Sequence, residues 1–365
     1  MKNILPELDG KTYIENLADD YEIRLCKEEE YEELVNFLRL YWKEDHIFVL
    51  SKEMLDFQHL DTYNHHYNFV IAKEKKSNEI HSLLGFVPTS QYDKEIKKAL
   101  IWPCIWKSRD DINRKGLGVA LYYYLKTHIE IETIAILGIS EVALSIYKHW
   151  NFSTGKIDQY VMPNYDKKSK LASGLDQCKR TTEDDTEGFV LKQLSIDDFF
   201  QISEEEDLFV QMEGYKTKNY YINRFYRHPF YHYHVLGIED SDHLAAVIVA
   251  RVSEHESNKC LRIVDYIGQV DAMIHVKNKL QKILTDNDLE YMDFVAVGLD
   301  DNVLKNAGFF NRKDYPGMIV PNYFEPFVQK NIDLDYAFKS VDNIQKMIFY
   351  KADADQDRPN ICRKK

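Results

Sequence analysis

Several features that would mark a secreted, membrane-bound or metal-binding protein are missing from the sequence. Its 365 residues contain only five cysteines, at positions 26, 104, 178, 260 and 362, and none of them forms a CxxC pair or a Cys/His cluster. No run of about 18 apolar residues occurs, and the N-terminal segment MKNILPELDGKTYIENLADD lacks a cationic stretch followed by an apolar one. We therefore expect a cytoplasmic protein with reduced thiols, no membrane span and no bound metal.

An excess of positive charge is also missing. The 60 acidic residues outnumber the 47 basic ones, which gives a formal net charge of -13 and disfavours long-range attraction to nucleic acid or to an anionic membrane. The hydrophobic fraction of 44% and the aromatic fraction of 13% are typical of globular proteins. Because 365 residues exceed the usual size of one compact core, we expect two domains and no nucleic-acid partner.

The spacing of apolar residues predicts an α/β arrangement in the first half. The expected elements are a strand at 21–27, a helix at 28–44, strands at 67–73, 80–88 and 97–106, a helix at 116–129, a strand at 133–139, a helix at 141–150 and a closing strand at 156–164. The three central strands are typical of an antiparallel meander. Pro103 lies in the third of them, where it cannot donate a ladder hydrogen bond and so indicates an edge, a bulge or a splay.

The second half repeats this pattern weakly. IYKHWNF (146–152) is matched by VLKNAGF (303–309) at an offset of 157 residues, and VMPNY (161–165) by IVPNY (319–323) at an offset of 158. Two matches in nearly one register indicate a duplication. We therefore predict a first domain at 1–166, a linker at 167–188, a second domain of the same fold at 189–340, and a C-terminal tail at 341–365.

The stretch NRKGLGVALYYYLK (113–126) is the clearest candidate binding site. The start of a helix offers backbone N–H groups without intrahelical partners and the positive end of the helix dipole, and glycines allow a ligand to approach closely. The turn therefore predicts a phosphate cradle, although it is neither a Walker A loop nor a GxGxxG fingerprint, and a turn without any ligand is the alternative interpretation. The candidate residues are Asn113, Arg114, Lys115, Gly116, Leu117, Gly118 and Val119.

This turn and the helix after the next strand resemble the GNAT superfamily of acyl-CoA-dependent N-acyltransferases. In that family the turn reads Gln/Arg-x-x-Gly-x-Gly/Ala and the helix reads Asn-x-x-Ala-x-x-x-Tyr-x-x-x-Gly-Phe. Here the helix positions are Ser140, Ala143, Tyr147, Asn151 and Phe152. This sequence departs from the family pattern at three positions: Asn113 replaces the usual Gln or Arg, Ser140 the usual Asn, and Asn151 the usual Gly. The resemblance covers about residues 21–166 and implies an α/β (α+β) fold with two tandem GNAT-like domains, each a mixed, mostly antiparallel sheet flanked by helices.

The resemblance implies transfer of an acyl group, acetyl in the first instance, from acyl-CoA to an amine. Such a reaction needs an N–H on a splayed strand to polarise the carbonyl, an acid for the leaving thiolate and a base for the amine. The N–H of Cys104 or Ile105 and the hydroxyl of Tyr147 match the first two roles, although a core tyrosine is the alternative for Tyr147. His46 is the candidate base, with His65 and His66 as competitors. The Cys104 thiol is more simply interpreted as buried and inert.

The acceptor is less closely specified. WKEDHI (42–47) and GKIDQYVMPN (155–164) resemble members found in surface-polysaccharide biosynthesis, which implies an amino-sugar acceptor, often nucleotide-linked. The corresponding turn of the second half, YIGQVDAMIHVKN (266–278), has one glycine and no cation before Lys277, so we expect no CoA there. FYRHPFYHYH (225–234) is either a stacking surface or core.

KADADQDRPN (351–360) resembles the start of a calcium loop, but Arg358 and Lys364 stand where Gly and Glu are required. We therefore interpret it as a polar tail that docks on a basic site.

Two further functions remain open. A peptidoglycan-type aminoacyltransferase also fuses two such domains but uses aminoacyl-tRNA, which the acidic charge does not favour. A noncatalytic sensor of acyl-CoA or a sugar nucleotide belongs to another class altogether. Substitution of Tyr147 distinguishes an acyl-CoA-dependent enzyme from a sensor: loss of turnover with retained CoA binding would indicate the enzyme, and no turnover by wild type with any substrate would support the sensor.

Overall fold

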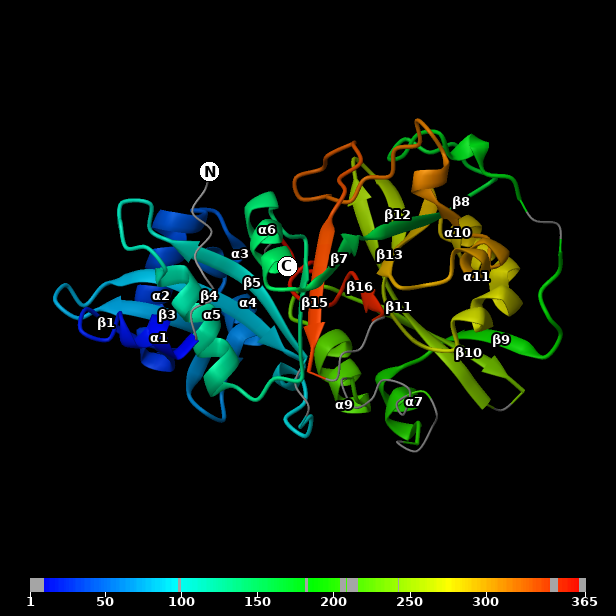
Figure 1. The fold of residues 1–365 in the computed structure, drawn as a ribbon. Coiled ribbons are helices and arrows are strands. Elements are labelled where there is room, and N and C mark those ends of the chain that lie inside the picture. Colours follow the sequence, from blue (N-terminus) through cyan, green and yellow to red (C-terminus); the bar gives the residue numbers. More distant parts are fainter. Residues whose placement is uncertain are drawn as a thin grey trace.

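Two mixed sheets with helices on their faces make up the protein (Figure 1). The computed structural model describes residues 10–97, 100–180, 183–203, 208, 216–241, 243–341 and 347–360. Cys362 and Lys364 lie outside the described residues, whereas Cys26, Cys104, Cys178 and Cys260 are free thiols. Within the described residues, no helix combines the length and apolar character needed to cross a membrane.

The first sheet contains the predicted antiparallel meander. Its order is β1 (Tyr21–Lys27), β3 (His66–Glu74), β4 (Ile80–Pro88), β5 (Leu100–Ser108), β6 (Thr133–Leu137), β15 (Asp335–Ser340) and β7 (Ser153–Lys156), with β2 (Leu60–Asp61) beside β3. The order of the second sheet is β9 (Phe189–Gln193), β10 (His234–Asp240), β11 (His243–His255), β12 (Asn258–Gly268), β13 (Tyr291–Val297), β8 (Asp158–Pro163) and β14 (Phe310–Asn311), with β16 (Phe349–Tyr350) beside β13.

The two sheets exchange one strand with each other. β8 forms where the closing strand of the first half is predicted, but it pairs with β13 of the second sheet, and β15 of the second half pairs with β6 of the first. The expectation that 156–164 closes the first sheet is therefore wrong. Both faces of β8 are buried, with Tyr160, Val161 and Met162 at most 2% exposed, so the sequence pattern predicts a central strand without indicating its sheet.

The identical strand order of the two sheets supports the duplication. α6 (Glu141–His149) and α11 (Asp301–Asn306) occupy matching places, and the residue before the final Phe of each match is left-handed, with φ of 57° at Asn151 and 88° at Gly308. Asn tolerates this conformation better than most residues, which explains the departure from Gly. The second sequence match is not structural, because Val161 lies in β8 whereas Ile319 lies in an isolated bridge to Ser173.

The remaining helices cover the sheets. They are α1 (Gly10–Glu15), α2 (Tyr31–Phe37), α3 (Ile47–Leu50), α4 (Lys52–His59), α5 (Leu117–His128), α7 (Ile196–Gln201), α9 (Lys218–Tyr221) and α10 (Lys277–Asp286). The helix predicted at 28–44 is not uniform, since α2 continues into a π turn at Leu38–Trp42. The predicted linker has little regular structure, but Leu171, Leu175 and Cys178 pack with Phe310 against the second sheet, so it is not a free linker.

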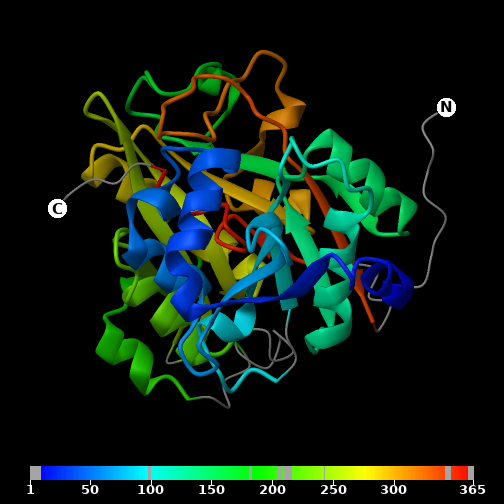
Figure 2. The same cartoon turned by 90° about the vertical axis from the view of Figure 1, so that its left-hand side faces the viewer.

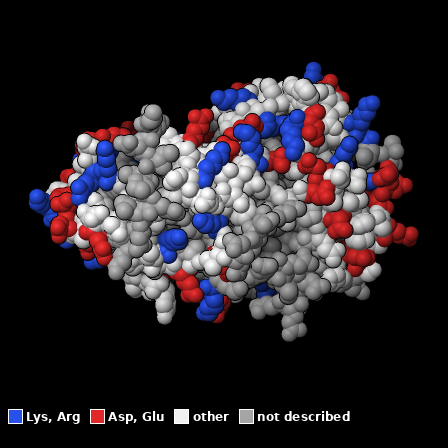
Figure 3. Space-filling model, viewed as in Figure 1, with Lys and Arg blue, Asp and Glu red and all other residues white. Residues whose placement is uncertain are grey.

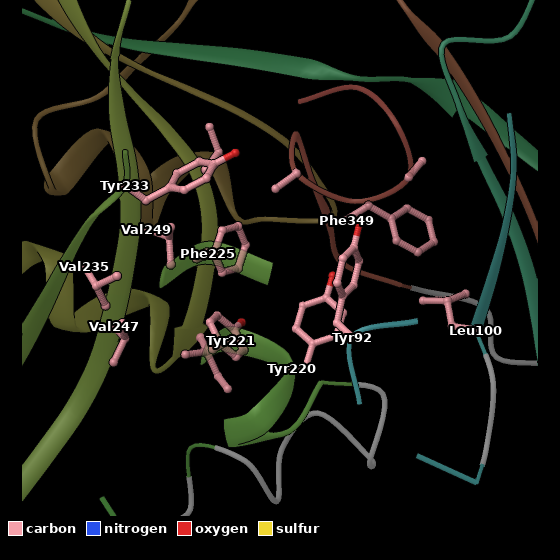
Figure 4. Packing of buried hydrophobic residues seen from close by; sticks show 14 of the residues in the cluster. Tyr92, Leu100, Tyr220, Tyr221, Phe225, Tyr233, Val235, Val247, Val249 and Phe349 are labelled. Atoms are coloured by element: carbon pink, nitrogen blue, oxygen red, sulfur yellow. The ribbon is translucent and has the colours of Figure 1, made fainter. Parts of the chain in front are cut away.

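A shared hydrophobic core joins the two halves. Figure 4 shows Tyr92 and Leu100 of the first half beside Tyr220 and Phe349, and the rings of Tyr92 and Tyr220 lie 5.3 Å apart. Figure 1 shows the C-terminal segment 347–360 in red between the two sheets, and in Figure 2, turned by 90°, the same red trace lies near the centre of the molecule. Basic and acidic side chains are interspersed on both halves of the face drawn in Figure 3.

Candidate functional site

The splay predicted around Pro103 is present. In the described part of the chain, β5 and β6 pair only through Leu100 with Thr133 and Ile101 with Ile134. The strands diverge beyond these two pairs, and Pro103 lies at the divergence, where its missing N–H removes a potential rung of the ladder. Pairing with β4 is also irregular here, with a register shift between Leu84 and Phe86. Backbone groups of β5 are therefore left free for a ligand.

A cavity of about 590 Å³ opens at the splay. Its walls come from β5, the turn before α5 with the first residues of that helix, the end of β6 with the loop after it, α6, and the C-terminal residues Asp355, Gln356 and Arg358. Trp42, at the end of the π turn, lies at its margin. Of the residues predicted to bind the cofactor, the cavity is lined by Cys104, Arg114, Gly116, Leu117, Gly118 and Val119.

The other three predicted cofactor residues lie outside the cavity lining. Asn113 and Lys115 are exposed beside it, and Ile105 is 1% exposed in the core cluster that contains Phe48. Arg114 lines the cavity, but its Nη2 donates to the Asn16 carbonyl at 3.1 Å and lies 3.3 Å from an Asp20 carboxylate oxygen. The backbone therefore contributes more to the predicted cradle than the cationic side chains do.

Both glycines of the turn are required by its geometry. Gly116 is the N-cap of α5 and has a φ of 82°, a left-handed conformation that L side chains rarely adopt. A Cβ on Gly118 would lie 3.1 Å from Nε1 of Trp106, and that nitrogen donates to the Gly118 carbonyl at 3.1 Å. The first turn of α5 thus presents its N–H groups and positive dipole end to the cavity, which suits a pyrophosphate.

Tyr147 lies on α6 in the wall of the same cavity and is 2% exposed. Its ring contacts Phe152 and Trp150 at centroid distances of 5.0 and 6.0 Å, which fixes the direction of the side chain. Burial raises the pKa of the hydroxyl above its ordinary value. The group therefore stays protonated at neutral pH and can donate a hydrogen bond or a proton.

The Cys104 thiol lines the cavity but is held in its neutral form. Burial, followed by the negative charge of Asp355, raises its pKa well above the ordinary value. Since the thiolate is the reactive form of cysteine, this environment argues against a covalent acyl intermediate on Cys104.

None of the three candidate histidines lines the cavity. His46 is 4% exposed and acts as the N-cap of α3, its Nδ1 accepting from the Phe48 N–H at 3.3 Å. Burial, and then the nearby Arg358, lower its pKa to about 2, which makes His46 a poor base at neutral pH. His65 is exposed and bound to Glu28 at 2.8 Å, and His66 lies at the start of β3.

A second cavity of about 470 Å³ adjoins the first, and both are lined by Asp355, Gln356 and Arg358. Gln356 Nε2 donates to the Leu137 carbonyl at 3.2 Å, at the end of β6. Asp355 is the only carboxylate that lines both cavities in the part of the chain that the structure describes. Sequence reasoning missed these three residues, because no local pattern in KADADQDRPN indicates which distant strands the segment contacts.

The other two aspartates of that segment hold it in place. Asp353 lies 2.8 Å from Lys216 Nζ, and Asp357 accepts from Arg251 at 2.7 Å and from Tyr233 at 2.8 Å. The segment therefore contacts buried cations, but it is not the predicted polar tail, because Asp353 and Asp357 are at most 2% exposed and β16 pairs with β13. The stretch 225–234 divides between both interpretations, since Phe225 is core whereas Phe230 and Tyr231 line the second cavity.

The helix start and the strand splay that are open in the first half are both filled by the chain itself in the second half. Asp185 accepts from the N–H groups of Asn278 and Lys279 at 2.7 and 3.2 Å, so a carboxylate of the chain occupies the start of α10. β12 and β13 pair only through residues 261–263 and 292–294 of the described chain. Beyond that, β16 pairs with β13, and the Ala352 N–H donates to the Val264 carbonyl at 2.8 Å.

Comparison with known proteins supports the fold. No protein-family model matches the sequence, and no curated protein sequence matches it significantly. Among solved structures, a GCN5-related N-acetyltransferase from Anabaena variabilis is similar with a TM-score of 0.53 at 11% identity, over 88% of this chain and 73% of that one. A probable N-acyltransferase from Enterococcus faecalis is similar with a TM-score of 0.52 at 8% identity, over the same shares. The fold is therefore that of two GNAT-like domains in tandem.

Proposed function

We propose that this protein transfers an acyl group from an acyl-CoA to an amine in the cytoplasm. The observation that carries the proposal is the coincidence, in one cavity, of the β5/β6 splay, the glycine start of α5 and the buried hydroxyl of Tyr147. In the second half, the corresponding helix start and splay are filled by the chain itself. One open and one closed copy are consistent with a single acyl-CoA site in the first half.

The residues present fit the cofactor part by part. The N–H groups at the start of α5 would hold the pyrophosphate, with Arg114 beside it. The unpaired backbone of β5 at Cys104 or Ile105 would polarise the thioester carbonyl. The acyl-CoA supplies the activated acyl group, and the protein supplies binding, orientation and proton transfer.

Tyr147 and Asp355 carry the two proton transfers. The acceptor enters through the second cavity, and Asp355 at the junction of the two cavities takes a proton from its amine. The nitrogen forms a bond to the acyl carbon, the carbon–sulfur bond breaks, and the phenolic proton of Tyr147 passes to the departing thiolate. Asp355 replaces His46 in this scheme, because His46 is a helix cap with a lowered pKa.

We propose that the acceptor is a nucleotide-linked amino sugar that is used in the biosynthesis of a surface glycan. The support is the resemblance of WKEDHI and GKIDQYVMPN to proteins of that pathway, and a second cavity walled by aromatic rings at Phe230, Tyr231 and Phe324. Aromatic rings of this kind stack on sugars and bases.

Calorimetric titration with CoA and acetyl-CoA tests the cofactor site. Wild type should bind both, and Gly118→Trp should abolish binding, because its side chain would occupy the start of α5 beside Trp106. Thr127→Trp, on the exposed end of the same helix, is the matched control and should bind like wild type. Absence of binding in wild type would make the glycine turn structural and favour an aminoacyl-tRNA enzyme or a sensor.

A further inference from the structure

A buried ammonium group in the second cavity has no acidic partner within the described part of the chain. Lys351 is 4% exposed, lines the cavity, and its Nζ donates to Asn322 Oδ1 at 2.8 Å. Among the described residues, no carboxylate forms an ion pair with it. Buried charges in proteins are usually paired, so Lys351 is an exception among the buried cations that line this cavity.

The neighbouring cations differ from Lys351 in this respect. Arg262 is held by both carboxylate oxygens of Asp293, at 2.9 and 2.8 Å, and Arg251 is bound to Asp357 at 2.7 Å. Arg358 lies 3.5 Å from Asp355. The charged groups that act most strongly on Lys351 are Arg262 and Arg251, which repel its charge, and Asp357 and Asp293, which are already paired. Glu254, Glu325 and Asp355 also line the cavity, but none of them forms an ion pair with Lys351.

The rest of the cavity fits the other parts of an acceptor. Phe230, Tyr231 and Phe324 form apolar walls, and the guanidinium of Arg251 stacks over Tyr231 at 4.1 Å. Gln356 lines both cavities, so the cavity that Lys351 lines adjoins the first one. An acceptor could therefore place one end at Lys351 and its amine near Asp355.

We infer that Lys351 is the anion-binding subsite of the acceptor, and that the acceptor carries a phosphate or carboxylate group at the end remote from its amine. That the bound molecule is an acyl acceptor rests on the proposed function. The anion subsite itself depends only on the cavity and on the Lys351 ammonium, which has no ion-pair partner among the described residues. An anion bound there would supply the missing partner of Lys351 and stabilise its charged form.

Proton uptake on anion binding tests the subsite without knowledge of the acceptor. Burial, and then the charge of Arg262, lower the pKa of Lys351 to about 7, so at a pH near 8.5 the amine is mostly neutral and must take up a proton to bind an anion. Sulfate and acetate are suitable probes for the two kinds of anion, because neither titrates in this range. Calorimetry in two buffers of different ionisation enthalpy would measure the proton uptake.

The expected result is binding of one of these anions with uptake of nearly one proton. Lys351→Met should weaken binding at least tenfold and remove the uptake, whereas Lys351→Arg, which stays charged, should bind without uptake. Gly118→Trp should behave as wild type, which excludes the start of α5 as the binding place. Thermal unfolding of each variant confirms that it is folded.

Two results would overturn the inference: no anion binding in wild type, or uptake that persists in Lys351→Met. Because CoA is titrated separately, failure of the subsite with CoA binding intact leaves the acyl-CoA site standing. Anion binding with proton uptake but without CoA binding would instead contradict the proposed acyl transfer and leave the anion subsite standing.

Discussion

Lys351 provides a test of the structure through stability alone. Its pKa of about 7 in the folded protein compares with an ordinary value of 10.5. Between these two values the unfolded chain binds more protons than the folded one, so the free energy of unfolding rises with pH, by up to about 1.4 kcal/mol per pH unit from this group. Below pH 7 both states are charged and the group contributes no slope.

Replacing Lys351 by Met removes this dependence. At pH 7 the burial of the ammonium costs about 4 kcal/mol relative to a neutral side chain, and the substitution also leaves Asn322 Oδ1 without its donor, which costs about 2 kcal/mol. We therefore expect Lys351→Met to be more stable than wild type by about 2 kcal/mol at pH 7. The advantage should disappear and then reverse as pH rises.

Urea unfolding followed by tryptophan fluorescence, repeated from about pH 7 to about pH 9.5, measures both quantities. Other groups titrate in this range, but they are common to both proteins and cancel in the difference. Lys282→Met is the matched control, because Lys282 is an exposed lysine of α10 paired with Asp286 at 2.9 Å, and its slope should equal that of wild type. The reasoning is refuted if Lys351→Met has the same slope as wild type.

Three further substitutions probe the proposed chemistry and the closed second copy. Tyr147→Phe should lower kcat for acyl transfer by about 10²- to 10³-fold while CoA affinity stays within about twofold of wild type; unchanged turnover would exclude Tyr147 as the acid. Asp355→Asn should lower kcat by a similar factor and leave CoA titration unchanged, and a loss confined to CoA affinity would contradict its role as base. Asp185→Ala should lower the free energy of unfolding by about 1 kcal/mol through loss of the α10 cap, measured by urea unfolding, and CoA binding gained or lost in this variant would contradict a site confined to the first half.

Local features of the fold could be predicted because their causes lie within a few residues. Gly116 is left-handed at the start of α5, and Ser140 caps α6 by accepting from the Ala143 N–H at 3.3 Å. Pro103 lacks an N–H wherever it is placed, so the interruption of β5 followed from the residue itself. All three positions lie in the lining of the candidate cofactor cavity.

The acceptor side of the site could not be predicted in the same way. Asp355 lies near Cys104 only because the segment 347–360 runs between the sheets, and that path depends on ion pairs of Asp353 with Lys216 and of Asp357 with Arg251. His46 looked like a base because histidine titrates near neutral pH. Its burial, which lowers its pKa to about 2, is a property of the packed core.

Sequence alone was sufficient to predict the duplicated element order, the glycine turn and the place where β5 is interrupted, because hydrophobic period, backbone sterics and a missing N–H act locally. Long-range packing, by contrast, determines that β8 and β15 exchange sheets, that Asp185 and β16 fill the second copy, and that Lys351 has no acidic partner among the described residues. These outcomes depend on contacts between residues far apart in the chain. Burial, pairing and the resulting pKa values follow from those contacts.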